Sequence, residues 1–185
     1  MEFPGQLTLL REFEKRDVAA LLAIHSDPRF LRYYAPELGT PEHTQMLVER
    51  FIEWSVENPR RNFQLAIADR ETKTLLGSCG VRTKDCPQGQ AEFGIGIGAD
   101  WWGKGIASEA ARMILRFAFR KLHLKEIRGV TVSENEAARK FASQPGFSLG
   151  IPRRGEAWML QKNWSALDVT LSRETWERLN SDEYE

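Results

Sequence analysis

Residues 92–107 read EFGIGIGADWWGKGIA, and they place a glycine-rich loop between a strand and the N-terminus of a helix. The first half of this stretch has the pattern of a strand, and a helical pattern follows Gly105. A glycine-rich loop between a strand and a helix N-terminus binds anions, because the first-turn N–H groups have no backbone partner and the helix dipole favours negative charge. Gly103 and Gly105 let the backbone approach such a ligand closely. We therefore expect this loop to bind an anion of the pyrophosphate kind.

Two other interpretations of the same glycines stay open. Gly98, Gly103 and Lys104 match the first three fixed positions of the P-loop pattern G-x-x-x-x-G-K-[ST]. Gly105, however, stands where that pattern supplies a hydroxyl to magnesium. The glycines can also simply form a tight turn between a strand and a helix. The surrounding sequence has to decide among the three.

The chain after the loop predicts a helix and then a strand. The helix begins after Gly105 and continues to about Leu122, with one apolar face. Residues 126–132 alternate as a strand does. Because a helix separates this strand from the one that ends at Ile97, the two should pair in parallel through a right-handed crossover.

The chain before the loop predicts an antiparallel meander of three strands, at residues 63–68, 75–81 and 91–97. A strand at residues 7–10 and two helices precede the meander. The first helix has Asp17 as its N-cap and ends near Pro28, and the second is capped by Thr40 and ends at Asn58.

The C-terminal third predicts a short helix, two strands and a last helix. The short helix runs from about Asn135 to Pro145, residues 147–169 hold the two strands, and Ser172 caps the last helix. The predicted fold class is therefore mixed α/β, with an antiparallel meander plus one parallel strand pair, flanked by helices.

Composition predicts one globular domain over residues 1–185 with a frayed acidic tail at about 180–185. The 26 Lys and Arg residues balance 26 Asp and Glu residues, which argues against nucleic acid as a partner. No apolar run is long enough to span a membrane, and Arg11 and Glu12 interrupt any signal peptide, so we expect a cytoplasmic protein that binds no membrane. Cys79 and Cys86 form no CxxC motif and the histidines lack metal-ligand spacing, so we expect no metal. Monomer and homodimer stay open.

The loop resembles the acetyl-coenzyme A (acetyl-CoA) loop of the GNAT acetyltransferases. The resemblance lies in the run WWGKGIASEA at residues 101–110, with Ala91 and Glu92 before it. Within that superfamily the run is similar to the branch of RimJ/RimL-type ribosomal-protein N-terminal acetyltransferases. Asn135, Ala138 and Gly146-Phe147 are similar to the superfamily's second coenzyme A motif.

The resemblance implies a sheet that splays beyond the parallel pair, with acetyl-CoA as co-substrate in the gap. Backbone N–H groups of the loop would hold its pyrophosphate, Lys104 would add charge, and Trp102 would pack. One strand would pair with the pantetheine arm and polarise the thioester carbonyl, and Asn135 would bond the arm. The residues that the resemblance assigns to the co-substrate are Gly96, Ile97, Gly98, Trp102, Gly103, Lys104, Gly105, Ile106, Ala107 and Asn135.

The implied reaction is direct attack of a neutral amine on the acetyl thioester, without a covalent enzyme intermediate. We place Glu92 and Asn135 in the catalytic centre and interpret Glu92 as the general base. Strand alternation puts Glu92 on the face of Gly94 and Gly96, where open space would admit a water chain. The alternative is that Glu92 is a surface charge at a strand edge.

One departure from the family pattern concerns the general acid. Many members carry a tyrosine in the helix after the equivalent of Asn135, but Ala142 stands at that position. Water, Ser133 or another hydroxyl would then protonate the leaving thiolate. His25 is expected to be exposed or to cap its helix rather than to catalyse.

By position, the acceptor side includes Phe30, Tyr33 and Tyr34, which we interpret as a packed junction between helix and loop. The resemblance favours an acetyl-CoA-dependent N-acetyltransferase whose second partner is an amine acceptor, either a protein N-terminus or a small molecule. A non-catalytic acyl-CoA-binding module and a P-loop-like nucleotide-binding protein are the alternatives.

Overall fold

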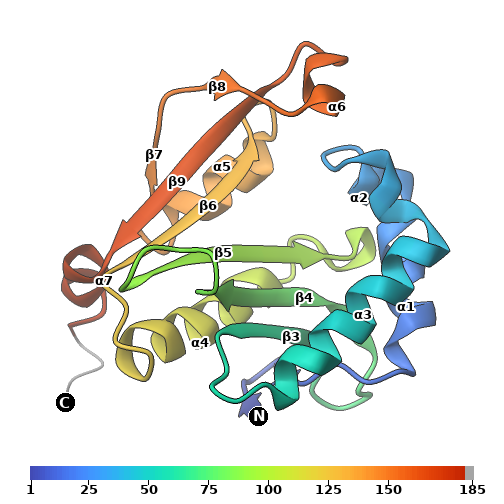
Figure 1. The fold of residues 1–185 in the computed structure, drawn as a ribbon, viewed down its shortest axis with the longest axis horizontal. Helices are drawn as coiled ribbons and strands as arrows, with labels where there is room; N and C mark the ends of the chain where they lie inside the picture. The colour runs from blue at the N-terminus through green and yellow to red at the C-terminus, as the bar shows by residue number, and fades with distance from the viewer. Residues whose placement is uncertain (182–185) are drawn as a thin grey trace.

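The fold is one continuous sheet with helices on both faces (Figure 1). The computed structural model describes residues 1–181. In this part of the chain the strand order is β1-β2-β3-β4-β5-β6-β9-β7, and β8 pairs with β9. The strands are β1 (Glu2–Pro4), β2 (Thr8–Arg11), β3 (Asn62–Asp69), β4 (Leu75–Arg82), β5 (Gln90–Ile97), β6 (Glu126–Val132), β7 (Ser148–Leu149), β8 (Arg153–Arg154) and β9 (Ser165–Ser172). The helical segments are α1 (Asp17–His25), α2 (Pro28–Leu31), η1 (Pro36–Gly39), α3 (Pro41–Val56), η2 (Ala99–Trp101), α4 (Ile106–Arg120), α5 (Glu136–Ser143), α6 (Ala157–Leu160) and α7 (Arg173–Leu179).

The sheet splits between β5 and β6. β3, β4 and β5 form the predicted antiparallel meander, and β5 then pairs in parallel with β6. That parallel pairing runs only from Gln90 opposite Glu126 to Glu92 opposite Arg128, whereas β6 pairs with β9 along its whole length. Beyond Glu92 the strands separate, and Figure 1 shows β6 and β9 running away from β5. The predicted fold class is confirmed.

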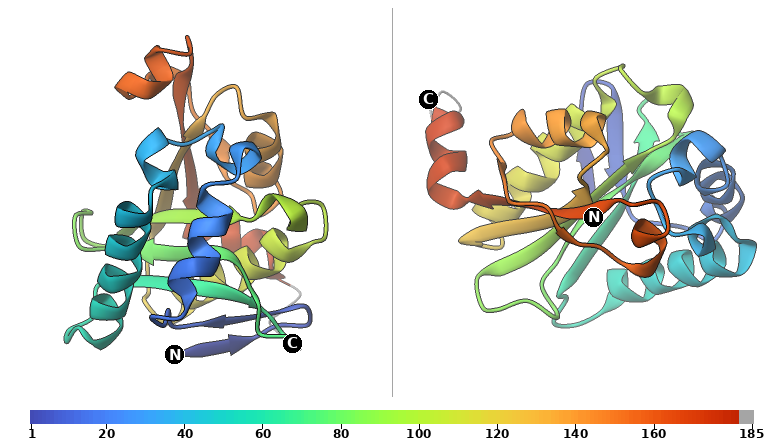
Figure 2. Two further views of the ribbon diagram at one scale, coloured as in Figure 1. Left: turned by 90° about the vertical axis from the view of Figure 1, so that its right-hand side faces the viewer. Right: turned by 90° about the horizontal axis from the view of Figure 1, so that it is seen from above.

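Apolar cores lie on both faces of the sheet. Leu65 and Ile67 of β3 are fully buried in the same cluster as Ile114 of α4, whereas Ala66 between them belongs to the cluster of Val48 in α3. Neighbouring strand residues point to opposite faces, so α4 and α3 must cover opposite faces. Figure 2 shows this arrangement, with α1 and α3 on one side and α4 and α5 on the other.

The start of α1 differs from the prediction. Asp17 is not the N-cap but the first residue of the helix, and Arg16 precedes it. The Asp17 carboxylate accepts two hydrogen bonds of 2.7 Å from the buried Arg11 guanidinium and one of 2.8 Å from the Glu14 N–H. The prediction was wrong because the carboxylate binds a buried cation from a neighbouring strand, a partner that no local pattern reveals.

Two other helix caps are confirmed, and several short elements come without a sequence signal. The Thr40 hydroxyl accepts the His43 N–H at 3.3 Å, and the Ser172 hydroxyl accepts the Thr175 N–H at 3.1 Å. Residues 147–169, expected to hold two strands, contain β7, β8, α6 and the start of β9. β1, β7 and β8 have no more than three residues each, too few to show a period. Of the predicted frayed tail, residues 182–185 lie outside the described residues.

Candidate active site

The loop before α4 has two residues in the left-handed backbone region. Gly103 has φ 73° and Gly105, the N-cap of α4, has φ 78°. A Cβ added to Gly103 would touch nothing within 4 Å, and one added to Gly105 would meet only Leu7 Cδ1, at 3.7 Å. Space therefore does not require glycine at these positions, but the backbone conformation does.

This conformation leaves a row of unpaired amides, which we call the amide row and define as the backbone N–H groups of residues 103–108. None of them donates a hydrogen bond to any other residue between 1 and 181. The first N–H that makes a helical hydrogen bond is that of Glu109, which donates to the Gly105 carbonyl at 3.0 Å. Successive unpaired N–H groups at the positive end of a helix dipole bind anions. The backbone N–H groups of residues 103–108 are therefore the donors available to an anion at this loop.

Lys104 and the two tryptophans of the loop make contacts within this region. Lys104 Nζ lies 4.6 Å from the centre of the Trp101 ring. Trp102 was expected to pack, but its side chain is 51% exposed and its indole N–H donates to the Ile97 carbonyl at 2.8 Å. That hydrogen bond ties the loop back to the end of β5.

Strand alternation determines which backbone groups of β5 face the gap. The Gly98 N–H donates to the Leu76 carbonyl at 2.8 Å, and the Gly96 carbonyl lies against Gly77, so both groups face β4. The groups of Ile95 and Ile97 then face the other way, toward the gap beside β6. Of Gly96, Ile97 and Gly98, which the resemblance assigns to the co-substrate, only Ile97 faces the gap. Ile95 faces it too, and the sequence alone does not show which alternate residues bond β4.

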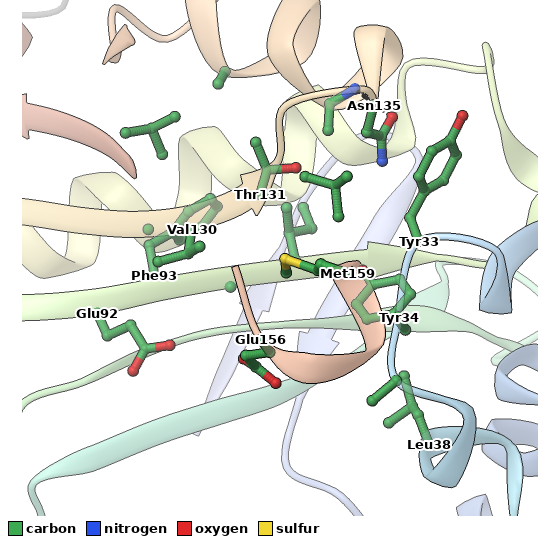
Figure 3. Close-up of a pocket in the computed structure, with 18 of the residues that line it drawn as sticks. Tyr33, Tyr34, Leu38, Glu92, Phe93, Val130, Thr131, Asn135, Glu156 and Met159 are labelled. Atoms are coloured by element: carbon green, nitrogen blue, oxygen red, sulfur yellow. Dashed lines mark hydrogen bonds between the residues drawn. The ribbon is translucent and has the colours of Figure 1, made fainter. Parts of the chain in front are cut away.

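A cavity of about 530 Å³ occupies the gap between β5 and β6. Its walls come from both strands, from α5 and α6, and from the segment between α2 and α3. Glu92 and Asn135, far apart in the sequence, both line it (Figure 3). The Asn135 Oδ1 caps α5 by accepting the Ala138 N–H at 3.1 Å, so its amide group is left to bond a ligand in the cavity.

Glu92 has a cationic partner that the sequence did not predict. Its carboxylate is 3.0 Å from Arg82 Nη2, and Arg82 lies directly opposite Glu92 in the β4–β5 pairing. The Arg82 guanidinium would also be 3.0 Å from a Cβ on Gly94, so it fills the space expected to be open beside Glu92. The Glu92 side chain is 57% exposed, which leaves it reachable by water from the other side.

Aromatic rings fill the space that the missing side chain of Gly96 leaves beside β5, which we call the notch at Gly96. A Cβ on Gly96 would lie 3.0 Å from Phe30 Cζ and 3.5 Å from the Tyr34 hydroxyl oxygen, so the space expected to be open there is occupied. Tyr34 stacks on Phe30 with ring centres 4.7 Å apart, and Phe30 stacks on His25 at 5.3 Å. The junction is packed as predicted around Phe30, which is buried, but Tyr33 and Tyr34 line the cavity.

His25 is buried rather than exposed. It is 7% exposed, and its Nδ1 atom has no hydrogen-bond partner in the described part of the chain. Burial, with a smaller contribution from the nearby His43, lowers the pKa of His25 to about 4. The side chain is therefore a neutral component of the aromatic stack, and the expectation of an exposed or capping histidine was wrong.

A metal-binding cluster, a disulfide and a helix that could cross a membrane are all absent from the described residues. Residues 1–181 contain no cluster of three His, Cys, Asp or Glu side chains that could hold a metal ion. Cys79 and Cys86 are not bonded to each other. None of the described helices has the length and apolarity needed to cross a membrane.

Comparison with known proteins gives one family. Residues 8–148 match the model described as an acetyltransferase (GNAT) domain. An uncharacterized N-acetyltransferase, p20 of Bacillus licheniformis, is 29% identical over 75% of this chain and 77% of its own length. An acetyltransferase of the GNAT family from Bacillus anthracis has the same fold, with a TM-score of 0.78 and 20% identity over 94% of this chain and 99% of its own. The ribosomal-protein-S5-alanine acetyltransferase of Vibrio fischeri also has this fold, with a TM-score of 0.75 and 16% identity over 95% of this chain and 98% of its own.

Proposed function

The chain belongs to the GNAT acetyltransferase family, and on this premise we propose that it transfers the acetyl group of acetyl-CoA directly to a primary amine. The acceptor is the α-amino group of a protein N-terminus or the amine of a small molecule. The observation that carries the proposal is the amide row, which lies at the start of α4 beside the split in the sheet. A diphosphate on this row would leave the rest of a coenzyme A molecule free to enter the gap.

The donor would be held mainly by backbone groups. The diphosphate would accept hydrogen bonds from the N–H groups of residues 103–107, with Lys104 adding its charge. The pantetheine arm would extend along β5, where Ile95 and Ile97 turn their N–H and carbonyl groups toward the gap. The Asn135 amide group would donate to the arm from the opposite wall. Family membership also sets aside the P-loop alternative.

The chemistry requires an amine nitrogen with a free electron pair. The nitrogen attacks the thioester carbon, a tetrahedral oxyanion forms, and the bond from carbon to sulfur then breaks. A β5 N–H facing the gap would stabilise the oxyanion. Gly96 lies between Ile95 and Ile97, whose N–H groups face the gap, and Glu92 is four strand residues away, roughly 13 Å. Glu92 would therefore accept the amine proton through water.

Two measurements test the proposed function. Calorimetric titration should show that acetyl-CoA binds, and thiol release with a panel of peptide and small-molecule amines should show turnover. Mass spectrometry of the amine should then find one added acetyl group. Binding without thiol release for any amine would contradict the proposal and favour the non-catalytic acyl-CoA-binding module.

A further inference from the structure

The leaving sulfur needs a proton donor, and the helix after Asn135 does not supply one. Ala142 stands in α5 where a tyrosine is common in the family, and its methyl group carries no proton to give. Ser133, the donor considered from the sequence, is not among the residues that line the cavity. The hydroxyls that do line the cavity within residues 1–181 are those of Tyr33, Tyr34 and Thr131.

Of these three, Tyr34 has its hydroxyl beside the part of β5 whose backbone groups would bind the thioester. Its hydroxyl oxygen would be 3.5 Å from a Cβ on Gly96, the residue between Ile95 and Ile97. Tyr33 instead stacks on Trp164, with ring centres 5.4 Å apart, in the cluster that contains Met159. Thr131 is an aliphatic alcohol and a far weaker acid than a phenol, whose pKa is about 10.

The Tyr34 ring is held in place while its hydroxyl is left available. The ring lies nearly parallel to Phe30, at 7°, and the notch at Gly96 receives the edges of both rings. Tyr34 is among the residues that line the cavity, and its hydroxyl, which lies beside Gly96, makes no hydrogen bond to any residue in the described part of the chain. A rigid ring with an unused hydroxyl at the reacting centre is what a proton donor requires.

We propose that the Tyr34 hydroxyl donates a proton to the departing sulfur of acetyl-CoA. This assignment rests on the proposed transferase function. As the bond between carbon and sulfur breaks, the electron pair stays on sulfur and the phenol proton moves to it, so that the free thiol leaves. The phenolate regains a proton through water from Glu92, which has accepted the extra proton of the amine nitrogen, so the nitrogen loses one proton and the sulfur gains one.

The surroundings of Tyr34 favour the neutral phenol. Burial raises the pKa of Tyr34, so the group carries its proton at neutral pH. Besides Tyr34, the charged and titratable side chains that line the same cavity are those of Tyr33, Glu37, His43, Glu92 and Glu156, and His25 lies behind Phe30 in the stack. The described residues that line the cavity include no Lys or Arg, whose positive charge would stabilise a phenolate.

The first test is Tyr34→Phe in the full chain, with acetyl-CoA and an amine that the wild type acetylates. The expected result is a fall in kcat of about 100-fold, with the acetyl-CoA Kd unchanged. The thermal midpoint should also stay the same, because the lost hydroxyl has no protein partner. A kcat within twofold of the wild type would overturn the assignment, and so would a 100-fold loss found in Tyr33→Phe instead.

The second test separates proton donation from packing. A fluorinated tyrosine at position 34 keeps the ring and lowers the pKa of its phenol, so the alkaline fall in kcat should move to lower pH. An unchanged pH profile would overturn the assignment. A wild type that binds acetyl-CoA but acetylates no amine would instead contradict the proposed function itself, and the assignment would fall with it.

Discussion

Gly103 is the residue whose backbone contributes most directly to the amide row. Alanine at φ 73° costs about 1–2 kcal/mol, so the loop of Gly103→Ala should relax and turn its amides away. We expect the acetyl-CoA Kd of this variant to rise at least tenfold by calorimetry. Gly89→Ala is the matched control, because Gly89 has φ 82° but lies in the hairpin before β5. Equal Kd values for the two variants would contradict a role of the amide row.

Glu92 gives a second prediction. Glu92→Gln removes the proton acceptor but keeps the side-chain volume, so kcat should fall about 100-fold. Arg82→Gln breaks the same ion pair while keeping the carboxylate, and should retain kcat within a few-fold. If the two variants have the same kcat and pH profile, Glu92 acts only as the partner of Arg82.

Among the elements, α4 is joined to the N-terminal strands through Glu109. The Glu109 carboxylate, in the first turn of α4, accepts the N–H groups of Gln6, Leu7 and Thr8 and the Thr8 hydroxyl, the last at 2.6 Å. These bonds direct a negative charge away from the amide row in the same helix turn. The first turn of α4 and the start of β2 are therefore held together by one side chain.

Removing that side chain should loosen both elements. Burial raises the pKa of Glu109, but hydrogen bonds from Thr8, Leu7 and Gln6 outweigh it and lower the pKa overall. The stability that Glu109 contributes is therefore full at neutral pH and is lost as pH falls through its lowered pKa. We expect Glu109→Ala to cost about 1–2 kcal/mol of unfolding free energy at pH 7 in urea titrations.

Glu174→Ala is the control for that variant. Glu174 also lies in the first turn of a helix, α7, but is exposed, so it matches the loss of charge near a helix dipole. Its cost should be a few tenths of a kcal/mol. An equal cost for the two variants would mean that the hydrogen bonds to residues 6–8 add nothing.

For the molecule as a whole, His25 makes stability depend on pH. Its pKa in the folded chain is about 4, below the ordinary value of 6.5, so the unfolded chain binds a proton first as pH falls. The unfolding free energy should then drop between pH 6.5 and 4, by at most about 3 kcal/mol from this group. His25→Phe keeps a stacked ring and should lose this part of the pH dependence, whereas the exposed His123→Asn should keep it. Parallel curves for His25→Phe and the wild type would contradict the assignment.

Elements with a clear period were predictable, and so was the anion loop. The meander, α4, the parallel pair and the caps at Thr40 and Ser172 follow from residues close in sequence. The pairings that define the site join residues far apart, such as Gly96 with Tyr34, and these contacts depend on the tertiary packing. The pairing of β5 with β4 also determines that the backbone groups of Ile95 and Ile97, rather than those of Gly96 and Gly98, face the gap.

The charge environment of Glu92 needed the same tertiary information. Arg82 is its cross-strand neighbour only because the β4–β5 hairpin has this register, and a shift of one residue would have put the guanidinium on the other face. His25 shows the same limit, since its burial comes from Phe30 and the segment that follows it. Local sequence predicted which residue types were present, but only the packed chain determined their partners.

The most direct test of a coenzyme A site at the amide row is amide hydrogen exchange of residues 103–108 with and without coenzyme A. These N–H groups have no acceptor within residues 1–181, so they should exchange fast in the unliganded protein. Saturating coenzyme A should slow all or most of them at least tenfold, because the diphosphate would become their acceptor. Unchanged exchange at these residues, at a coenzyme A concentration that calorimetry shows to be saturating, would contradict the account.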